Sequence, residues 1–262
     1  MNCSLNDLFF SLCNDDNSAC IGKCQEDLFG YSDETAALPR QYEETDIKLI
    51  SNYFSNNFTP SLLDEPVRCF FELSSDVFDI VIHAWMSELP IEKELFAFGR
   101  KIIEAANTAA SPDAAALDRS DHNTVIILKA AEKVQREIHR MQGLLRFSPE
   151  TNGIYTARCA PDHLIIPSFS EYLTARFGET AWVVIDEKRS IFLSRKPYEK
   201  SKISILKSFA SEDGQQEAYQ RRDEWEELWK HYHKTVNNES RKNTGLQRQL
   251  MPKRYWKYLP EA

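Results

Sequence analysis

The chain has 262 residues, a formal net charge of −8 at pH 7, and 42% hydrophobic and 27% charged residues. These fractions are those of a globular protein and exclude a chain that is disordered throughout. No apolar run approaches the roughly 18 residues of a membrane span, so no membrane partner is predicted. Asp7, Asp15 and Asp16 stand where a signal peptide would be basic, and we therefore expect a cytoplasmic protein.

Charge is distributed unevenly along the chain. Residues 1–100 contain 6 Lys and Arg against 18 Asp and Glu, whereas residues 187–262 contain 17 against 11. Within residues 229–257, eight basic residues and four aromatic ones accompany a single acid, Glu239. Because basic side chains neutralise phosphates and aromatic faces stack on bases, this segment is the predicted nucleic-acid-binding region. The alternative is a solvated basic helix whose aromatic residues are core.

The cysteines and glycines match no common catalytic or metal-binding motif. Four of the six cysteines lie in the first 24 residues, but the spacing of Cys20 and Cys24 is not that of a common zinc site and no paired histidine follows. The chain has no Gly-rich phosphate loop, nucleophile elbow or His-Glu-x-x-His helix. We therefore expect reduced thiols, no metal and no cofactor.

Helical spacing of apolar residues dominates the first half of the chain. Residues 1–40 are acidic, and only the apolar positions from Leu5 to Leu12 allow one or two amphipathic turns. Further helices are predicted from the three- and four-residue spacing and from the prolines that end it: over residues 42–58, from Pro66 to about Ser74, over 76–89 with Ser75 as cap, and over 90–106. Residues 108–116 are predicted to be a linker. Residues 1–120 are therefore expected to form an acidic, mainly helical region.

A long helix is predicted to lead from this region into a sheet. It begins near Asn123, whose side chain can cap it, and places Val134, Ile138 and Met141 on its apolar face. Gly143 is predicted to end the helix in a left-handed conformation, and residues 144–147 to continue as a strand.

Beyond residue 147 the spacing of apolar residues is no longer helical, which predicts further strands. They are expected over residues 153–159, 182–186 and 190–194, with a hairpin turn over 149–153 and a helix over 167–177 that Gly178 caps. This order favours an α+β fold with a small antiparallel sheet of about four strands packed by helices. Residues 121–262 are thus expected to form an α+β module with basic C-terminal helices, over 215–238 and 241–249. The two regions can also form one compact domain.

Six segments of the chain carry a resemblance to a known family. They are residues 139–147, 160–163, 176–177, 182–186, 241–243 and 251–256. Through them the chain, over roughly residues 75–262, resembles an uncharacterised bacterial family of proteins assigned to DNA metabolism. In that family the module occurs beside a radical-SAM-type protein or joined to a uracil-DNA-glycosylase domain, and no reaction is established for it. The resemblance implies a role in DNA repair, with DNA and these two kinds of protein as partners.

Two residues are weak catalytic candidates. His163 follows Pro161 and Asp162 at the entrance to a helix, where it can contact phosphate, donate a proton, or cap and pack. Asp186 ends a strand, where a carboxylate can hold a metal or a base and is equally suited to a turn. Its expected ion-pair partner is Arg146 or Arg176.

The remaining candidates are nucleic-acid-binding residues. Arg241, Asn243 and Arg254 lie in an apolar-poor segment, and such side chains suit phosphates and base edges. The others are predicted to grip phosphates or stack on bases: Arg140, Arg146, Arg176, Lys253 and Trp256. Three hypotheses about function remain open. In the first the chain is a nucleic-acid-binding accessory of DNA repair, in the second it is an enzyme that acts on damaged DNA, and in the third it is a protein-interaction module that docks through its acidic first hundred residues.

Overall fold

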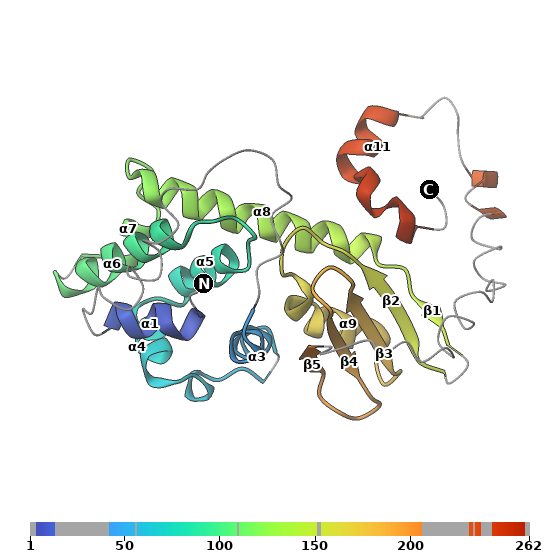
Figure 1. Cartoon of the computed structure of the whole chain (residues 1–262), viewed down its shortest axis with the longest axis horizontal. Helices are drawn as coiled ribbons and strands as arrows, with labels where there is room; N and C mark the ends of the chain where they lie inside the picture. The colour runs from blue at the N-terminus through green and yellow to red at the C-terminus, as the bar shows by residue number, and fades with distance from the viewer. Residues whose placement is uncertain are drawn as a thin grey trace. The chain divides into compact units, whose positions relative to one another are not determined.

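The structure is a computed structural model, which describes residues 4–13, 42–55, 57–108, 110–150, 153–205, 231–232, 234–236 and 243–259 (Figure 1). Contacts within the chain group it into two units. Unit 1 contains Met1–Ile138 and Asp162–Ser168, and unit 2 contains His139–Pro161 and Phe169–Ala262. The described part of unit 1 is helical and unit 2 holds a sheet with helices, which confirms the predicted α+β class. The expected domain boundary at residue 120 stays a prediction.

Unit 1 is built from helices whose apolar residues follow the predicted spacing. Their bounds are α1 Leu5–Cys13, α3 Glu44–Tyr53, the 3-10 helix η1 Pro60–Leu62, α4 Glu65–Leu73, α5 Ser75–Trp85, α6 Glu92–Asn107, α7 Pro112–Ala116 and the greater part of α8 His122–Leu144. The short helix α7 lies in the stretch predicted as a linker, and the Ser111 hydroxyl caps it by accepting the Ala114 N–H at 3.3 Å. That part of the linker prediction is wrong.

An aromatic cluster forms the core where α1 meets α4 and α5. Phe9 is 0% exposed, and its ring centroid lies 5.2 Å from that of Phe70 and 5.6 Å from that of Phe78. Leu5, Leu8 and Leu12 are buried on the same face of α1. The short amphipathic run near the amino terminus is thus a complete helix, stabilised by packing and not by its length.

Two predicted helix starts differ from the structure by one or two residues. Ser74, and not Ser75, caps α5, because its hydroxyl accepts the Val77 N–H at 3.2 Å. Helix α8 begins at His122, and the Asp121 carboxylate accepts the Thr124 N–H at 2.9 Å where Asn123 was expected to cap. A serine or aspartate one or two residues earlier offers the same kind of oxygen, so composition alone does not separate these alternatives.

The expected end of α8 at Gly143 is wrong. The helix continues to Leu144, and Gly143 is not among the residues with a positive φ. The strand predicted over residues 144–147 is also absent, and the first strand, β1, covers only Ser148–Pro149. Tertiary packing of Leu144 and Leu145, both buried, extends the helix past the glycine.

Unit 2 contains a mixed five-stranded sheet with the order β1-β2-β3-β4-β5. The other strands are β2 Tyr155–Cys159, β3 Trp182–Asp186, β4 Ile191–Arg195 and β5 Lys202–Ile205. Strands β2 and β3 are parallel and the other neighbours antiparallel, so the purely antiparallel expectation is wrong. The 3-10 helix η2 (Ile166–Phe169) and helix α9 (Ser170–Phe177) form the connection that a parallel pair requires.

One face of the sheet forms the core of unit 2. The register places Ala157, Val184 and Leu193 side by side, and each is at most 1% exposed. Their neighbours Thr156, Val183 and Ser194 point to the other face and are half-buried. Gly178, with φ +55°, ends α9 as predicted.

The C-terminal part contains helix α11 (Thr244–Leu250) and the 3-10 helix η5 (Lys253–Tyr258). They correspond to the helix predicted over 241–249 and the turn predicted after Met251. Most of the helix predicted over 215–238 lies outside the described residues. None of the described helices combines the length and the apolar character that crossing a bilayer demands.

Candidate nucleic-acid interface

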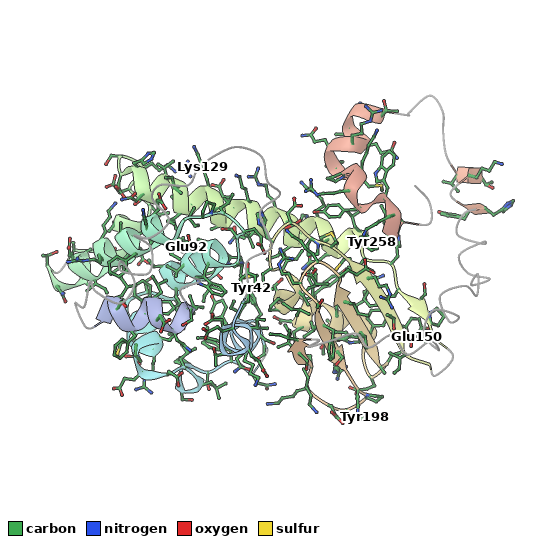
Figure 2. The ribbon with its side chains drawn as sticks, in the orientation of Figure 1. Tyr42, Glu92, Lys129, Glu150, Tyr198 and Tyr258 are labelled. Atoms are coloured by element: carbon green, nitrogen blue, oxygen red, sulfur yellow. The ribbon has the colours of Figure 1, made fainter. Side chains whose placement is uncertain are left out.

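The basic segment η5 is fixed to the sheet by one carboxylate. Glu187, in the turn after β3, accepts the Tyr258 hydroxyl hydrogen at 2.7 Å and lies 3.6 Å from the Lys257 Nζ atom. Its other oxygen lies 3.6 Å from a guanidinium nitrogen of Arg158 on β2. Burial of the Tyr258 hydroxyl raises its pKa above the ordinary value, and the negative charge of Glu187 raises this pKa further (Figure 2). Glu187 therefore joins β2 to the C-terminal segment.

Two apolar residues of the C-terminal segment complete the anchor. Tyr255 is 1% exposed and Leu259 is 4% exposed. The arginine before Tyr255 stays on the surface, with the Arg254 guanidinium 4.8 Å from the centroid of the Tyr255 ring. Such a cation–π contact limits the orientations of the arginine while leaving its charge exposed.

Lys253 and Trp256 form a similar pair. The Lys253 Nζ atom lies 5.9 Å from the centroid of the Trp256 ring, and the lysine is exposed. The indole N–H donates to the Met251 carbonyl at 2.9 Å, so the ring is fixed and half-buried. Exposed cations thus stand beside aromatic rings on one short, anchored segment, and their role in binding stays a prediction.

For Asn243 and Arg241 the structure does not show an exposed binding side chain. Asn243 caps α11, because its side-chain oxygen accepts the Leu246 N–H at 3.0 Å. This structural task occupies the oxygen that was expected to read a base edge. Arg241 lies outside the described residues, so its binding role stays a prediction.

Two arginines predicted to grip phosphates, Arg146 after α8 and Arg176 on α9, contact other groups of unit 2. Arg146 donates from Nη1 to the Gly143 carbonyl at 2.8 Å, which satisfies a backbone oxygen at the helix end. The Arg176 guanidinium lies 5.8 Å from the centroid of the Phe147 ring and 5.7 Å from that of Phe177. Arg140 is half-buried. Neither Arg146 nor Arg176 pairs with Asp186.

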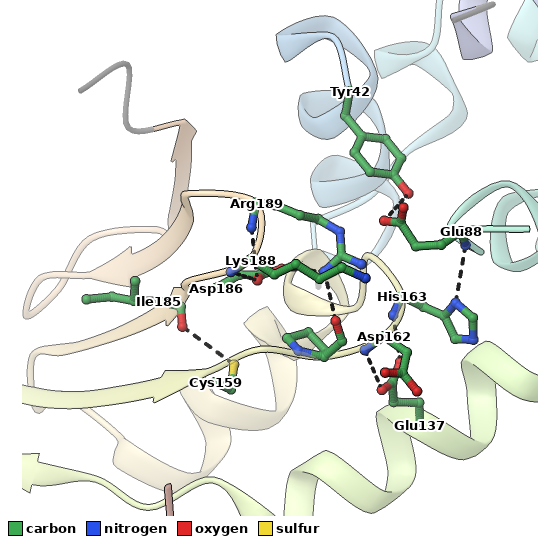
Figure 3. Close-up of polar contacts among 11 residues, drawn as sticks. Tyr42, Glu88, Glu137, Cys159, Asp162, His163, Ile185, Asp186, Lys188 and Arg189 are labelled. Carbon is green, nitrogen blue, oxygen red and sulfur yellow. Dashed lines mark hydrogen bonds and ion pairs between the residues drawn. The ribbon is translucent and has the colours of Figure 1, made fainter. Parts of the chain in front are cut away.

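Asp186 instead pairs with Arg189 in the turn between β3 and β4 (Figure 3). The two side chains are 0% and 2% exposed, and Nη1 lies 2.7 Å from Oδ2. The other oxygen accepts the backbone N–H groups of Lys188 and Arg189, and Arg189 also donates to the Pro161 carbonyl at 3.2 Å. Burial raises the pKa of the carboxyl, and the arginine opposes that rise. This geometry builds a turn and leaves no carboxylate oxygen for a substrate.

His163, the other catalytic candidate, belongs to unit 1. Its Nδ1 atom accepts the Glu88 N–H at 3.2 Å, which fixes the tautomer with hydrogen on Nε2 (Figure 3). The N–H groups of Asp162 and His163 donate to the Glu137 carboxylate at 2.8 and 2.9 Å. Glu137 is only 3% exposed, so it serves as the buried acceptor that holds this loop.

The thiols do not form a metal site in the described part of the chain. No three His, Cys, Asp or Glu side chains converge there to hold an ion, and neither Cys69 nor Cys159 forms a disulfide. Cys20 and Cys24 fall outside the described ranges. The expectation of metal-free early cysteines therefore stays a prediction.

Charge separates the two units. Over the whole sequence of unit 2 there are 21 Lys and Arg against 15 Asp and Glu, a net charge of +6. Unit 1 has 11 against 25, a net charge of −14. The basic excess coincides with the unit that displays Lys253 and Arg254.

A comparison with protein families matches residues 98–261, more than half of the chain, to a domain of unknown function, DUF4130. The chain belongs to the DUF4130 family. The match covers the end of unit 1 and nearly all of unit 2. It confirms an uncharacterised family, and its description names no activity. No curated protein and no solved structure gives a significant match.

Sequence reasoning missed three residues that shape this DUF4130 domain. Glu137 lies between the apolar positions Val134 and Met141, and an acid on the inward face of a helix was the available signal. Glu187 and Arg189 were read only as loop residues. The contacts of Glu187 join segments that are distant in the sequence, so spacing does not reveal them, whereas Arg189 pairs with Asp186 only three residues before it.

Proposed function

We propose that this DUF4130 protein is a nucleic-acid-binding accessory protein of DNA metabolism and that unit 2 supplies the binding surface. The observation that carries the proposal is the anchored segment η5, on which Lys253 and Arg254 are exposed beside aromatic rings. The net charge of +6 on the unit that bears this segment supports the same interpretation.

The physical argument concerns the free energy of binding phosphates. Each cation that neutralises a phosphate releases condensed counterions, and this term drives binding without reading sequence. Ordering a free lysine or arginine side chain on binding costs roughly 0.5–1.5 kcal/mol. Cation–π contacts and the Glu187 anchor restrict the segment before binding, so less of that cost remains.

The cellular context of the proposal rests on the family resemblance. We place the protein in the cytoplasm and in DNA repair, where it presents DNA to a partner enzyme. The partner is a radical-SAM-type protein or a uracil-DNA glycosylase. Co-purification of the full chain with either enzyme, with and without added DNA, tests this part separately.

The test of binding itself is a filter-binding titration of the full chain against single-stranded and duplex DNA at several salt concentrations. The proposal predicts that the logarithm of affinity falls linearly with the logarithm of salt, by about 0.9 for each phosphate contact on duplex. No binding to either DNA form at low salt would contradict it.

A second candidate function is supported by unit 1. Its net charge of −14 suits a basic protein partner, because complementary charge accelerates association. Capture of a partner without any affinity of the chain for DNA would select this alternative. The enzyme hypothesis is weaker, because Asp186 is enclosed by Arg189 and two backbone N–H groups.

A further inference from the structure

An exposed tyrosine stands at the tip of the β4–β5 hairpin (Figure 2). Tyr198 is 86% exposed, and its φ is +60°. Within the described part of the chain its hydroxyl makes no hydrogen bond. The ring therefore contributes little to the packing of unit 2.

The backbone at this position is one that tyrosine adopts at a cost. The Glu199 N–H donates to the Lys196 carbonyl at 3.1 Å, which closes a four-residue turn with Pro197 second and Tyr198 third. Proline at the second position and positive φ at the third are the features of a type II turn, where the third residue is usually glycine or asparagine. A bulky side chain in this region costs about 1–3 kcal/mol.

Neighbouring residues hold the turn in place. The Glu179 carboxylate accepts the Tyr198 N–H at 2.8 Å, and Glu179 lies 3.5 Å from a guanidinium nitrogen of Arg195. Arg195 also donates from Nε to the Glu199 carbonyl at 2.9 Å and from Nη1 to the Gly178 carbonyl. The turn is thus fastened both to the loop after α9 and to the end of β4.

Lysines flank the tyrosine in the sequence. Lys196, Lys200 and Lys202 lie within four residues of Tyr198, and the two nearby acids are engaged, Glu199 by Lys202 at 2.9 Å and Glu179 by the Tyr198 N–H and Arg195. A single exposed aromatic side chain is common on protein surfaces and needs no function. An exposed ring on a strained, fastened turn between lysines is a different arrangement, because strain is retained where the surroundings impose it.

We propose that Tyr198 is a stacking residue that binds an unpaired base of single-stranded or locally opened DNA, while the flanking lysines contact its phosphates. Every base presents a flat face, so such stacking needs no particular sequence. A tyrosine with few rotatable bonds, on a fixed turn, loses little freedom when it stacks. This inference rests on the proposed function and specifies its substrate, namely unpaired nucleotides.

The test compares three forms of the full chain, which are wild type, Tyr198→Gly and Tyr198→Phe. Glycine accepts the positive φ without strain, so Tyr198→Gly removes the ring and retains the turn. Their affinities are measured for a single-stranded oligonucleotide that contains 2-aminopurine and for a fully paired duplex of the same sequence. Quenching of 2-aminopurine fluorescence reports stacking directly.

The inference predicts that Tyr198→Gly weakens single-stranded binding by about 5- to 160-fold, which corresponds to the roughly 1–3 kcal/mol of one stacked base. Quenching should disappear in that variant. Duplex affinity should change less than twofold, and Tyr198→Phe should behave as wild type. Wild-type affinity and quenching in Tyr198→Gly would overturn the inference while leaving nucleic-acid binding intact. Failure of the wild-type protein to bind either DNA form would overturn both proposals.

Discussion

Particular carboxylates of unit 1 and unit 2 have different tasks. In unit 1, Asp79 accepts the Tyr53 hydroxyl hydrogen at 2.9 Å and lies 3.2 Å from the Nδ1 atom of His83, which is 6% exposed. In unit 2 the carboxylates of Glu179 and Glu187 fasten loops that display basic side chains. The difference shows that an acid can serve a basic surface by positioning its cations.

The largest expected effect concerns the buried pair Asp186–Arg189. Arg189→Ala leaves the Asp186 carboxylate buried without its guanidinium, and removing one partner of a buried pair costs about 3–5 kcal/mol. The free energy of unfolding by urea measures this. Lys188→Ala, next to it and exposed, is the control and should leave stability unchanged. Equal stability of both variants would show that the turn does not depend on the pair.

The second effect tests the inward pairing of unit 1. Glu137→Ala removes the acceptor for two backbone N–H groups, and each unsatisfied buried group costs about 1–3 kcal/mol. Glu132→Ala, on the exposed face of α8, is the matched control because its contact with Arg119 is 3.8 Å long and solvated. Thermal unfolding should separate the two variants. If they melt together, Glu137 is not the residue that holds the 162–163 loop.

A smaller effect separates positioning from simple charge. Glu187→Ala and Glu199→Ala each remove one negative charge from unit 2, so electrostatics alone predicts tighter DNA binding for both. If Glu187 anchors η5, Glu187→Ala should weaken DNA binding by several-fold, whereas Glu199→Ala should bind as well as wild type or better. Tighter DNA binding by the Glu187→Ala variant would show that Glu187 does not position η5 for binding.

The smallest effect is a pH dependence at the same anchor. The folded-state pKa of Tyr258 lies above its unfolded value of 10.0, because burial and the Glu187 carboxylate disfavour the phenolate. The contribution of this hydroxyl to stability is therefore present below pH 10 and is lost as the pH rises above it. Tyr258→Phe should flatten the fall in the free energy of unfolding between pH 10 and 11. An unchanged alkaline slope would contradict the assignment.

Much of the fold could be predicted because helices are recognisable from the local spacing of their apolar residues. The apolar spacing located α3, α4, α5, α6 and α8, and their prolines and capping residues placed most ends within a few residues. The sheet was harder. The parallel pairing of β2 and β3 is decided by how α9 returns the chain, and β5, which begins with a lysine, has too few apolar residues to stand out.

The candidate site could be predicted only in part. The exposure of Lys253 and Arg254 follows from their charge, because lysine and arginine are rarely buried, although Tyr255 and Leu259 of the same segment are. Glu187 as their anchor, and the positive φ of Tyr198, depend on contacts with residues far along the chain. The spacing of residues along the sequence does not reveal such contacts. The prediction that Asp186 forms an ion pair with Arg146 or Arg176 was wrong.

The most direct test of the central claim is the salt dependence of duplex DNA binding in two matched double variants. Lys253→Gln with Arg254→Gln removes two exposed cations of unit 2, and Lys129→Gln with Lys133→Gln removes two exposed cations from the unit 1 part of α8. The account predicts that the first variant lowers the slope of log affinity against log salt by about 0.9–1.8 and that the second leaves it unchanged. Equal slopes in both variants and wild type would contradict the claim that unit 2 binds nucleic acid through η5.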